Sequence, residues 1–464
     1  MQKPNQYFYV DRGRSYIHEV EDSMIGELLA AVDVAPEIKD AGLADNLVLV
    51  GGKNRDFFMG NTSNDDDFVI TNTTEEELLE IGLTKVQGTR FPVFLDSLGN
   101  EIALPRKEKS TGQSRDDFAM DAVGPDVSLE QDLKRRDLTI NSIAVRMNNG
   151  TIVTPPNQSP LDDLDNKVLR HVSGAFTEDP LRVVRLARFA ARFPDFTIAS
   201  ETQELAKTVV PALADEAQER VTEELLKTLR QAENPRIFFD VLKELNALEE
   251  FFPHVANLIN VPAGPNKYHG EEEDSFEHTM RIVEEISSIR PNDERAGLIA
   301  VFHDIGKTLT DSDEFPHHYN HTGDEATELV EEISQNLQLS NEHQGLIKSA
   351  VRFHMHAHKI NELNHGTLIE LSEHLHVENT GELDSVPHMT HGEFIALGRS
   401  DKRGRSSDEV STISQIEINR LIQAEQVIND IGGEEVLNRF EPNNGEHIGE
   451  LIHQERVREL RNRL

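Results

Sequence analysis

The hydrophobic and polar positions change their period once along the chain. Between residue 46 and about residue 155, short apolar runs alternate with turns, and these runs read NLVLV, DFVI, FPVFL, EIAL, IAVRM and TIV. Such runs are typical of strands, which predicts a small mixed sheet with one or two helices packed on it. From about residue 165, apolar positions recur three and four residues apart, as in LRVVRLARFAARF and HTMRIVEEISSI. This spacing predicts helices, so the expected fold class is α+β.

The change of period and the linker-like segment NVPAGPNKYHG at 260–270 divide the chain into consecutive predicted parts. These are an N-terminal extension (1–45), a mixed-sheet head (46–160), an all-α neck and body (161–260), a His-rich α-helical domain (270–375) and a helical C-terminal tail (376–464). Within the extension only the stretch IGELLAAV has a helical pattern, and we assign the extension no chemistry.

Composition limits the kinds of site that the chain can hold. Cysteine is absent from the 464 residues, which excludes a disulfide framework and any thiolate metal site. A metal ion would therefore be held by histidine and carboxylate. The sequence has no run of about 18 apolar residues, so no membrane span is expected. The first residues, MQKPNQYFYVDRGRSY, lack the apolar core of a secretion signal, and the expected location is the cytoplasm.

The formal net charge of −38 disfavours a nucleic-acid partner, because acidic surfaces repel phosphates. Two interpretations remain: a protein that avoids polyanions, or one adapted to high salt, where repulsion is screened. Basic residues nevertheless gather in the segment Lys134-Arg135-Arg136, between Arg182 and Arg192, and at the C-terminal end. That end either contacts nucleic acid or forms the alternating-charge face of a solvated helix; its basic residues are Arg456, Arg458, Arg461 and Arg463.

The segment NLVLVGGKNRDFFMGNTSNDDDFVI carries the first candidate chemistry. A buried strand runs into Gly51-Gly52, and paired glycines let a backbone approach a phosphate closely. Asp65 and Asp67 stand two positions apart at the start of the next strand, so both point to one face while Asp66 points away. Two carboxylates in this arrangement can hold Mg²⁺, as nucleotidyl transfer requires. The alternative is an acidic turn, which is common in so acidic a chain.

This segment resembles the signature of class II tRNA nucleotidyltransferases and bacterial poly(A) polymerases. The shared features are a strand, Gly-Gly, two variable residues, Arg-Asp, and then Gly, four residues and Asp-x-Asp. The resemblance implies that Gly52 and Arg55 contact the nucleotide and that Asp65 and Asp67 bind Mg²⁺. The family usually has an apolar residue where this chain has Asn54, and this departure concerns local packing.

Two further stretches resemble the same family. In DLKRRDLTINSIA the resemblance assigns Arg136 to the nucleotide, and Asp137 and Asn141 to the ribose site. A charged helix start is the alternative for this stretch. The stretch RFPVFLDSLGNEIALPRKEKSTG also follows the family, and the resemblance implies a mobile loop at the basic residues Arg106, Lys107 and Lys109.

The stretch RHVSGAFTEDPLRVVRLARFAARF contains an EDxxR motif, and the resemblance assigns base selection to its Asp179 and Arg182. A carboxylate accepts from the exocyclic amine of C or A, and a guanidinium beside it donates to ring acceptors. G and U present a carbonyl in place of that amine and are disfavoured. Arg185 and Arg188 align with arginines that contact the nucleotide or its phosphates. The alternative is a surface helix with i,i+3 salt bridges.

A second candidate site lies in the His-rich part. The motif VFHDIGK, which contains His303 and Asp304, resembles the HD phosphohydrolase superfamily, and His278 stands on a predicted helix before it. Adjacent His and Asp at a helix bend present a nitrogen and a carboxylate to one ion, and more distant residues complete its shell. We predict His278, His303, Asp304 and a distal Asp401 as ligands of a divalent metal (Ni, Mn, Co or Mg), with Lys307 able to neutralise a phosphate.

The remaining histidines near the HD motif have no predicted role. His317, His318 and His321 follow the HD motif in a short loop, without an assigned role. The cluster RFHMHAHK at 352–359 is interpreted as exposed and without function.

The order of the parts resembles the bacterial CCA-adding enzymes that carry an HD domain. The resemblance implies a nucleotidyltransferase that adds C, C and A to tRNA 3′ ends from CTP and ATP without a template. It also implies an HD domain that hydrolyses 2′,3′-cyclic phosphates or 2′-nucleotides. Expected partners are tRNA, CTP and ATP, with no membrane, and the chain is expected to be a monomer or homodimer. The alternatives are a poly(A) polymerase or partial CCA-adding enzyme, a phosphohydrolase with a non-catalytic RNA-binding head, and a non-catalytic RNA-binding scaffold.

Overall fold

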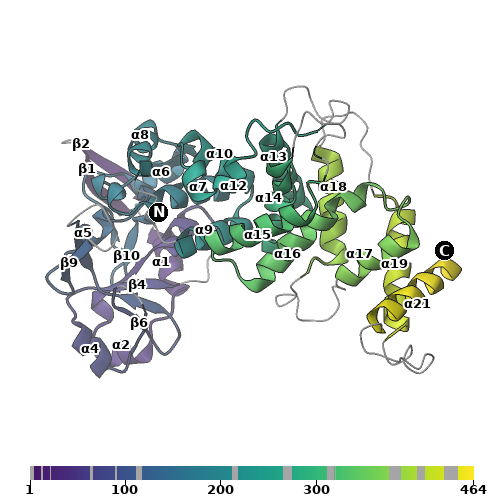
Figure 1. Ribbon diagram of the computed structural model, residues 1–464. Coiled ribbons are helices and arrows are strands. Elements are labelled where there is room, and N and C mark those ends of the chain that lie inside the picture. Colours follow the sequence, from purple (N-terminus) through teal and green to yellow (C-terminus); the bar gives the residue numbers. More distant parts are fainter. Residues whose placement is uncertain are drawn as a thin grey trace. The chain divides into compact units, whose positions relative to one another are not determined.

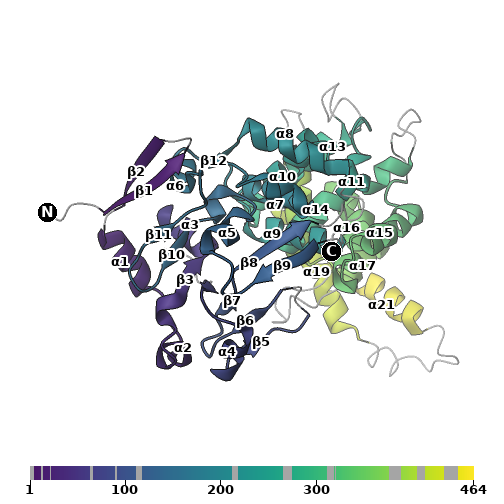
Figure 2. The same cartoon turned by 90° about the vertical axis from the view of Figure 1, so that its left-hand side faces the viewer.

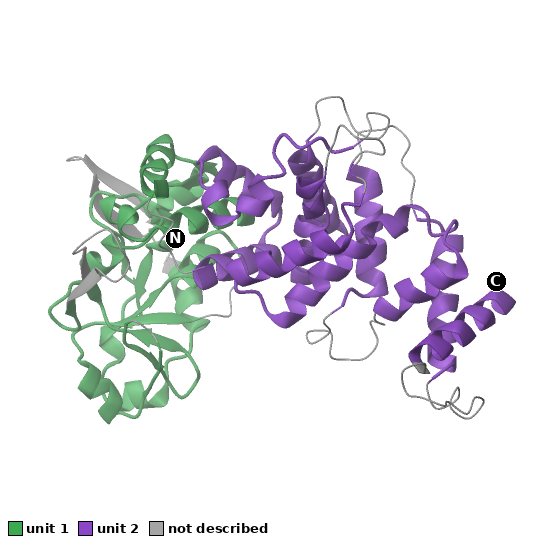
Figure 3. Cartoon of the chain, in the orientation of Figure 1, with its two compact units in different colours: residues 1–216 green, residues 217–464 purple. Residues whose placement is uncertain are grey.

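The structure is a computed structural model (Figure 1). It describes residues 5–11, 14–20, 22–62, 66–88, 91–110, 118–211, 218–264, 274–310, 318, 320–375, 388–404, 413–432 and 448–464. The chain forms two compact units, residues 1–216 and residues 217–464 (Figure 3). The predicted α+β class is confirmed, because strands and helices mix in unit 1 and helices alone make up the described part of unit 2. The unit boundary falls inside the range that the sequence analysis gave to one helical neck and body.

Unit 1 is built on a seven-stranded sheet of order β11-β10-β3-β4-β7-β6-β5. Each of the six apolar runs predicted as a strand forms one; these strands are β3 (Leu47–Val50), β4 (Asp67–Ile70), β6 (Val93–Leu95), β7 (Glu101–Ala103), β10 (Ala144–Arg146) and β11 (Ile152–Val153). The edge strand β5 (Thr84–Lys85) was not predicted. The β4–β7 pair is parallel and the other neighbours are antiparallel. Every residue of β3 is buried, which explains its uninterrupted apolar sequence.

Helices cover the sheet and extend the unit. Helix α5 (Leu129–Lys134) contributes Leu129 and Leu133 to a core cluster with residues of β3, β4 and β10. Its start is fixed by a capping box at Ser128. The other helices of unit 1 are α1 (Asp22–Ala30), α2 (Pro36–Asp40), α3 (Gly52–Phe58), α4 (Glu75–Glu80), α6 (Pro160–Asp165), α7 (Leu181–Arg192) and α8 (Ser200–Val209), with the short 3-10 segments η1 (Ala44–Asn46), η3 (Thr139–Asn141) and η4 (Gly174–Glu178).

Residues before the sheet contain more structure than their pattern predicts. Strands β1 (Asn5–Asp11) and β2 (Arg14–Val20) form an antiparallel hairpin ahead of α1. Helix α1 packs closely on the sheet, since a Cβ on Gly150 would lie 2.4 Å from Cγ2 of Ile25. The predicted mobile loop is also different: Arg106 and Lys107 begin strand β8 (Arg106–Ser110), which pairs with β9 (Phe118–Val123) (Figure 2). Two short parallel strands, β12 (Val168–Leu169) and β13 (Thr197–Ile198), complete the unit.

Unit 2 is helical throughout its described residues. Its helices are α9 (Gln218–Gln231), α10 (Arg236–Glu244), α11 (Leu248–Phe251), α12 (Pro253–Ala256), α13 (Ser275–Ile289), α14 (Glu294–Phe302), α15 (Asp324–Asn336), α16 (Asn341–Phe353), α17 (His365–His374), α18 (His391–Gly404), α19 (Gln415–Asp430) and α21 (Ile448–Arg463), with 3-10 segments η6 (Ile305–Leu309) and η7 (His354–His358). All residues of α14 after Glu294 are buried, and α9, α13, α16 and α18 pack around this helix. Among the described residues, no helix is long and apolar enough to cross a membrane.

Contacts of the C-terminal arginines favour a structural role for this end of the chain. Arg456 donates to the carbonyl oxygens of Ile431 and Ile428 at the end of α19, at 3.0 and 3.3 Å. Arg463 pairs with Asp430 at 2.7 Å, and Arg458 pairs with Glu455 at 3.0 Å. These arginines therefore hold α21 against its surroundings or form its alternating-charge face, as the alternative interpretation predicts.

Candidate active sites

The first site begins where β3 turns into α3. Gly51 has a φ of 80°, a left-handed value that a glycine adopts without strain. A Cβ at Gly51 would lie 2.7 Å from Oδ2 of Asp67, so any side chain there would displace this carboxylate. Antiparallel pairing of β3 with β4 sets Val50 opposite Asp67 and brings the carboxylate to the turn. Asp65 lies outside the described residues, and Asp66 forms an ion pair with Lys53 of α3.

Asn54, the departure from the family pattern, has a packing role that its side-chain amide explains. It is fully buried, and its Nδ2 donates to the carbonyl oxygens of Leu49 and Ile143 at 2.8 and 2.9 Å. One amide thus ties α3 both to β3 and to the segment before β10. An apolar residue would leave these two carbonyls without this donor, so the position is polar for a local structural reason.

A buried hydrogen-bond network joins the three predicted motifs. Arg55 is 3% exposed, and its Nη1 donates to Oδ1 of Asn141 at 2.7 Å. Asn141 in turn donates to Oδ1 of Asp137 at 3.2 Å. Oδ2 of Asp137 accepts from Nε of Arg185 on α7 at 2.8 Å. Arg55, Asp137, Asn141 and Arg185 were predicted from three separate stretches of sequence, and here they lie in one cluster.

A second connection runs through Asp56, which the sequence analysis did not select. Nε of Arg55 donates to Oδ1 of Asp56 at 2.8 Å, and Nη2 of Arg192 donates to Oδ2 of the same carboxylate at 3.1 Å. The Arg55 guanidinium also lies 5.4 and 5.2 Å from the ring centroids of Phe189 and Phe193. Both rings belong to α7 or its C-terminal end, so α3 is connected to α7 by polar and by aromatic contacts.

The electrostatics of this cluster follow from its burial. Burial raises the pKa of Asp137, but Arg185 and the donors from Leu138 and Asn141 outweigh it and hold this pKa below its ordinary value. Burial lowers the pKa of Arg55, and the positive charges of Arg192 and Arg188 lower it further against the opposing effect of Asp56.

Helix α7 is not a solvated surface helix. Arg182 and Arg188 are 8% and 6% exposed, which contradicts the alternative of surface salt bridges for these two. Arg182 donates to the carbonyl oxygens of Ala175 and, at 2.6 Å, of Arg135. Asp179 precedes the helix in an extended conformation, and its Oδ1 accepts from the backbone N–H of Leu181 at 3.2 Å.

Arg136 lies at the edge of the same region. Its Nη1 donates to the backbone oxygen of Asn141 at 3.4 Å, and its Nη2 lies 3.5 Å from the buried carboxylate of Asp132. Burial raises the pKa of Asp132, whereas Arg135 and Arg136 lower it and give a net decrease. The predicted residue Gly52 begins α3, and a Cβ there would lie 3.3 Å from Nη2 of Arg55.

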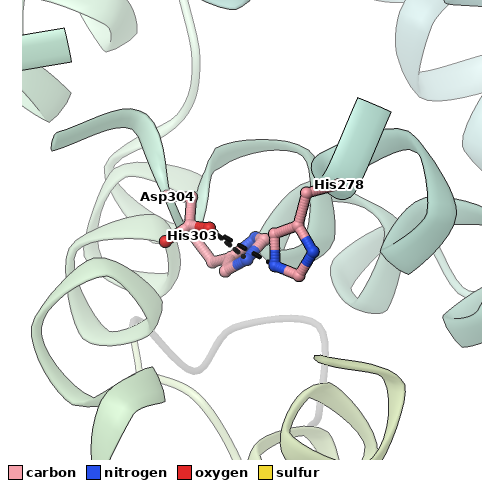
Figure 4. Close-up of side chains that lie close together, drawn as sticks. All are labelled: His278, His303 and Asp304. Carbon is pink, nitrogen blue, oxygen red and sulfur yellow. Dashed lines mark ion pairs between the residues drawn. The ribbon is translucent and has the colours of Figure 1, made fainter. Parts of the chain in front are cut away.

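The second site, in unit 2, brings together His278, His303 and Asp304 (Figure 4). His278 projects from α13, and the adjacent His303 and Asp304 follow the end of α14. Oδ2 of Asp304 lies 3.6 Å from Nε2 of His278 and 3.2 Å from Nε2 of His303. The predicted distal residue Asp401, on α18, also reaches the site, with its Oδ1 3.2 Å from Nε2 of His278. The structure therefore gathers all four predicted ligands.

A second group of potential ligands shares the same aspartate. Oδ1 of Asp304, the oxygen not used above, lies 3.3 Å from Nε2 of His354 and 3.7 Å from Nε2 of His321. Ligand atoms of His321, His354 and Asp304 lie within 4.8 Å of one another. Burial lowers the pKa of both His278 and His321 to about 4, so both present neutral nitrogens near pH 7.

The interpretation of the cluster at 352–359 as exposed is wrong. His354 is 2% exposed and belongs to the second group of ligands. His358 forms a hydrogen bond through Nε2 to Oδ2 of Asp401. The segment has no clear apolar period, but η7 continues directly from α16 and turns the side chains of His354 and His358 inward.

Two glycines allow the segments that carry these ligands to pack closely. A Cβ on Gly306 of the HD motif would lie 1.9 Å from the backbone oxygen of His321, so this glycine admits the segment that carries His321. A Cβ on Gly398 of α18 would lie 2.5 Å from Cβ of Ala357 in η7. Lys307 is buried, and its Nζ lies 2.7 Å from both Oδ2 of Asp304 and the backbone oxygen of Ala263.

Comparisons with known proteins concern the family and the fold of the chain. A family model described as "Poly A polymerase head domain" matches residues 47–170, and one described as "Probable RNA and SrmB- binding site of polymerase A" matches residues 195–259. A "Multifunctional CCA protein" of Nitrosococcus oceani is 39% identical over 365 residues, which cover 78% of this chain and 85% of the relative. One of Shewanella frigidimarina is 38% identical over 80% of this chain and 87% of its own length. The chain belongs to the multifunctional CCA protein family.

Solved structures agree with the fold of this family. A structure titled "The structure of CCA-adding enzyme apo form II" has a TM-score of 0.60 at 20% identity and covers 94% of each chain. The Bacillus stearothermophilus CCA-adding enzyme in complex with CTP has a TM-score of 0.58 at 15% identity and covers 93% of this chain and 94% of the other. The chain thus shares the fold of these CCA-adding enzymes, with a mixed sheet in its first part and helices in its second.

We predict that Asp137→Asn destabilises unit 1 by about 2 kcal/mol at pH 7, because the half-buried guanidinium of Arg185 loses its buried carboxylate partner. The folded-state pKa of Asp137 lies below its unfolded value, so its contribution is complete above the ordinary carboxyl pKa and is lost as pH falls toward the folded value. Urea unfolding at several pH values should therefore give a constant difference from wild type between pH 7 and 5 that shrinks below about pH 4. Glu204→Gln, in an exposed pair with Lys207, is the matched control and should change little. If the difference in unfolding free energy between wild type and Asp137→Asn stayed constant down to pH 3, the stabilisation would not come from the ionised Asp137 carboxylate.

Proposed function

We propose that the chain adds C, C and A to the 3′ end of tRNA from CTP and ATP without a nucleic-acid template. The observation that supports it most is the connected geometry of unit 1. The Asp67 carboxylate lies against the Gly51-Gly52 turn, and a single hydrogen-bond chain runs from Arg55 beside this turn to Asp137 and Arg185. Relatives named multifunctional CCA proteins, and a structural neighbour titled as complexed with tRNA, support the same substrates.

The residues would divide the work as follows. Gly52 at the start of α3 offers its backbone N–H to the triphosphate. Arg136 would contact the nucleotide, and Asp137 with Asn141 would form its ribose site. Asp179 with Arg182 would read the base. Arg185 and Arg188 would neutralise phosphates. The 3′-hydroxyl oxygen of the RNA attacks the α-phosphorus and releases its proton, the bond to the β-phosphate breaks, and pyrophosphate leaves.

Asp65 and Asp67 would hold Mg²⁺, which neutralises charge on the phosphates during transfer. The donor set fits a hard cation, because carboxylate oxygens are the ligands that Mg²⁺ prefers. A ligand of this Mg²⁺ must lie beside the phosphates, and the Asp67 carboxylate faces the glycine turn where the phosphates would lie.

Poly(A) polymerase and partial CCA addition remain the alternatives within this class. The name of the matching head model fits the first of them, while the names of the full-length relatives favour CCA addition. Family membership disfavours a non-catalytic head and a non-catalytic scaffold.

We predict that Asp67→Asn lowers nucleotide addition by at least about 10³-fold, because it removes a ligand charge where the transition state needs it. The assay is incorporation of labelled CTP and ATP into tRNA that lacks its last three nucleotides. Asp195→Asn, on an exposed residue that pairs with Lys167, is the control and should retain activity. If wild type adds only a run of A, the poly(A) alternative replaces this proposal. If Asp67→Asn adds nucleotides normally, the assigned metal site is wrong.

We further propose that unit 2 is a metal-dependent phosphohydrolase acting on 2′,3′-cyclic phosphates or 2′-nucleotides at RNA ends. The residues fit two adjacent divalent ions, because the two oxygens of Asp304 face different sets of histidines. His278, His303, Asp304 and Asp401 would hold one ion, while His321, His354 and Asp304 would hold the other. Nε2 of His303 is buried without a hydrogen-bond partner among the described residues, as suits a ligand atom. Such ions activate water for attack on a phosphoester, and nitrogen donors favour Ni, Mn or Co over Mg.

Lys307 would assist by charge. Its ammonium lies 2.7 Å from Asp304 and could also meet a phosphate oxygen, although it is buried beside the carboxylate in this structure. The overall acidity of the chain suits small phosphoester substrates poorly unless such local cations offset it.

We predict that His354→Ala abolishes hydrolysis of 2′,3′-cyclic AMP and lowers Ni²⁺ binding from two ions per chain to one, because only the second ligand set is lost. Nucleotide addition should stay within about twofold of wild type, since His354 belongs to unit 2 and the predicted transferase residues belong to unit 1. Metal content measured after dialysis against Ni²⁺ gives a readout independent of activity. His365→Ala, at the start of α17 and outside the cluster, is the matched control. Retention of two ions by His354→Ala would refute the second ligand set.

A further inference from the structure

A buried arginine lies at the end of α14 that is remote from the proposed metal centre of unit 2. Arg295 stands in the first turn of this helix and is 7% exposed. Its Nε donates to Oε1 of Glu393 at 2.7 Å, and its Nη2 donates to Oε2 of the same carboxylate at 3.2 Å. These two parallel hydrogen bonds form the planar fork that arginine and a carboxylate can make. A third donor, Nη1, reaches Oε1 of Glu342 at 2.7 Å.

Both carboxylates belong to the first turn of a helix. Glu393 on α18 is fully buried, and its Oε2 also accepts from the backbone N–H of Thr390 at 2.7 Å. The hydroxyl of Thr390 accepts from the N–H of Glu393 at 3.1 Å, so these two residues make the reciprocal contacts of a capping box. Glu342 lies in the first turn of α16 and is half-buried. Arg295 therefore joins the starts of α14, α16 and α18.

Each of these three helices carries a proposed metal ligand toward or just beyond its other end. The ligands are His303 and Asp304 after α14, His354 after α16, and Asp401 near the end of α18. At about 1.5 Å of rise per residue, the axial distance from the joined residue to the ligand is about 12 Å in α14 and α18 and about 18 Å in α16. The arginine is thus too far away to bind an ion, but the helices that it joins are the supports of the ligands.

The connection is both strong and directional. Burial lowers the pKa of Arg295, but the hydrogen bonds and charges of Glu393 and Glu342 outweigh burial and raise this pKa above its ordinary value. Breaking a buried ion pair is costly, because one charge is left without compensation. Apolar packing has no preferred direction, whereas the fork fixes the distance and the angle between the starts of α14 and α18.

We propose that Arg295 and its two glutamates are positioning residues for the metal centre of unit 2. Through α18, Glu393 sets the place of Asp401 and so the affinity for the first ion, the one that Asp401 would bind. Through α16, Glu342 sets the place of His354 and so the affinity for the second ion, the one that His354 would bind. The inference rests on the metal centre proposed above, and it divides the control of the two ions between two glutamates.

The test is calorimetric titration of the full chain with Ni²⁺. Glutamine keeps the size of glutamate, but its amide group cannot accept both donors of the arginine fork. In a His354→Ala background, which keeps only the first ion, Glu393→Gln should raise the Kd for Ni²⁺ about tenfold, an effect typical of groups that orient metal ligands. Glu342→Gln should change that Kd by less than about twofold. In the chain that keeps His354, Glu342→Gln should weaken, again about tenfold, only the binding step that His354→Ala lacks.

Two further variants separate positioning from a general loss of stability. Arg295→Lys should weaken both binding steps, because one ammonium cannot hold both carboxylates in fixed directions. Glu417→Gln is the matched control, since Glu417 is a buried glutamate in the first turn of α19, a helix that carries no proposed ligand. This variant should leave both Ni²⁺ constants unchanged.

Three results would overturn the proposal. The first is unchanged Ni²⁺ constants in both Glu393→Gln and Glu342→Gln. The second is equal weakening of both steps by either glutamine variant, and the third is the same loss in Glu417→Gln, because both would indicate a general loosening of unit 2. If Glu393→Gln does not fold, Glu342→Gln decides alone, since its carboxylate is only half-buried.

A second readout is the Ni²⁺ dependence of 2′,3′-cyclic AMP hydrolysis. The ligands themselves are intact in Glu393→Gln, so its kcat should come within about twofold of wild type once Ni²⁺ is saturating, while half-maximal activity should need more Ni²⁺. A kcat that stays low at saturating Ni²⁺ would contradict a positioning role. A wild type that binds two ions but hydrolyses nothing would refute only the proposed phosphohydrolase, because the calorimetric constants decide the positioning role without it.

Discussion

The head of this protein depends on a buried guanidinium that has little access to water. A charge in such a place is tolerated only when carboxylates and hydrogen-bond acceptors surround it. Arg55 meets this requirement with Asp56 and Asn141, and each of these is bound in turn to another part of the unit. The constraint works in both directions: the segments around Arg55 satisfy its donors, and Arg55 fixes where those segments lie. The glycine turn, the Asp137–Asn141 pair and α7 are thereby held in one geometry.

Unit 2 also has a buried charged group whose partners come from several segments, and this group is a carboxylate. Asp304 presents one oxygen to His278 and His303 and the other to His321 and His354. Burial raises the pKa of Asp304, but Lys307, His303 and His354 keep it well below its ordinary value, so the residue is a carboxylate ready to bridge cations. Asp304 follows the end of the buried helix α14. Gly306 allows the segment with His321 to approach it, and Gly398 allows α18 to approach η7.

Much of this arrangement could be predicted from the sequence, for physical reasons that are specific to each residue. Short apolar runs in the sequence predict the strands of the head, and Asp67 lies at the start of one of these strands. His278, His303 and Asp304 were predicted because VFHDIGK, with a histidine on the helix before it, resembles the HD superfamily. Asp401 was predicted as the distal carboxylate that such a site needs. His354 and His358 were missed because their role depends on how α16 ends and on the approach of α18, which no local pattern encodes. Asp56 and Arg192 were missed because a buried pair far apart in sequence looks like two ordinary surface charges.

The structure shows where basic residues lie in a chain whose net charge is −38. Several arginines are gathered around Arg55 and on α7, while Arg456 and Arg463 at the C-terminal end contact α19 or the residue that follows it. The central claim is that the head selects C and A by its own side chains. The most direct test is to sequence the 3′ ends that wild type makes on tRNA lacking its last three nucleotides, with all four nucleoside triphosphates present. The account predicts ends that read C-C-A and stop there, and ends that read as runs of A, or that carry all four bases, would contradict it.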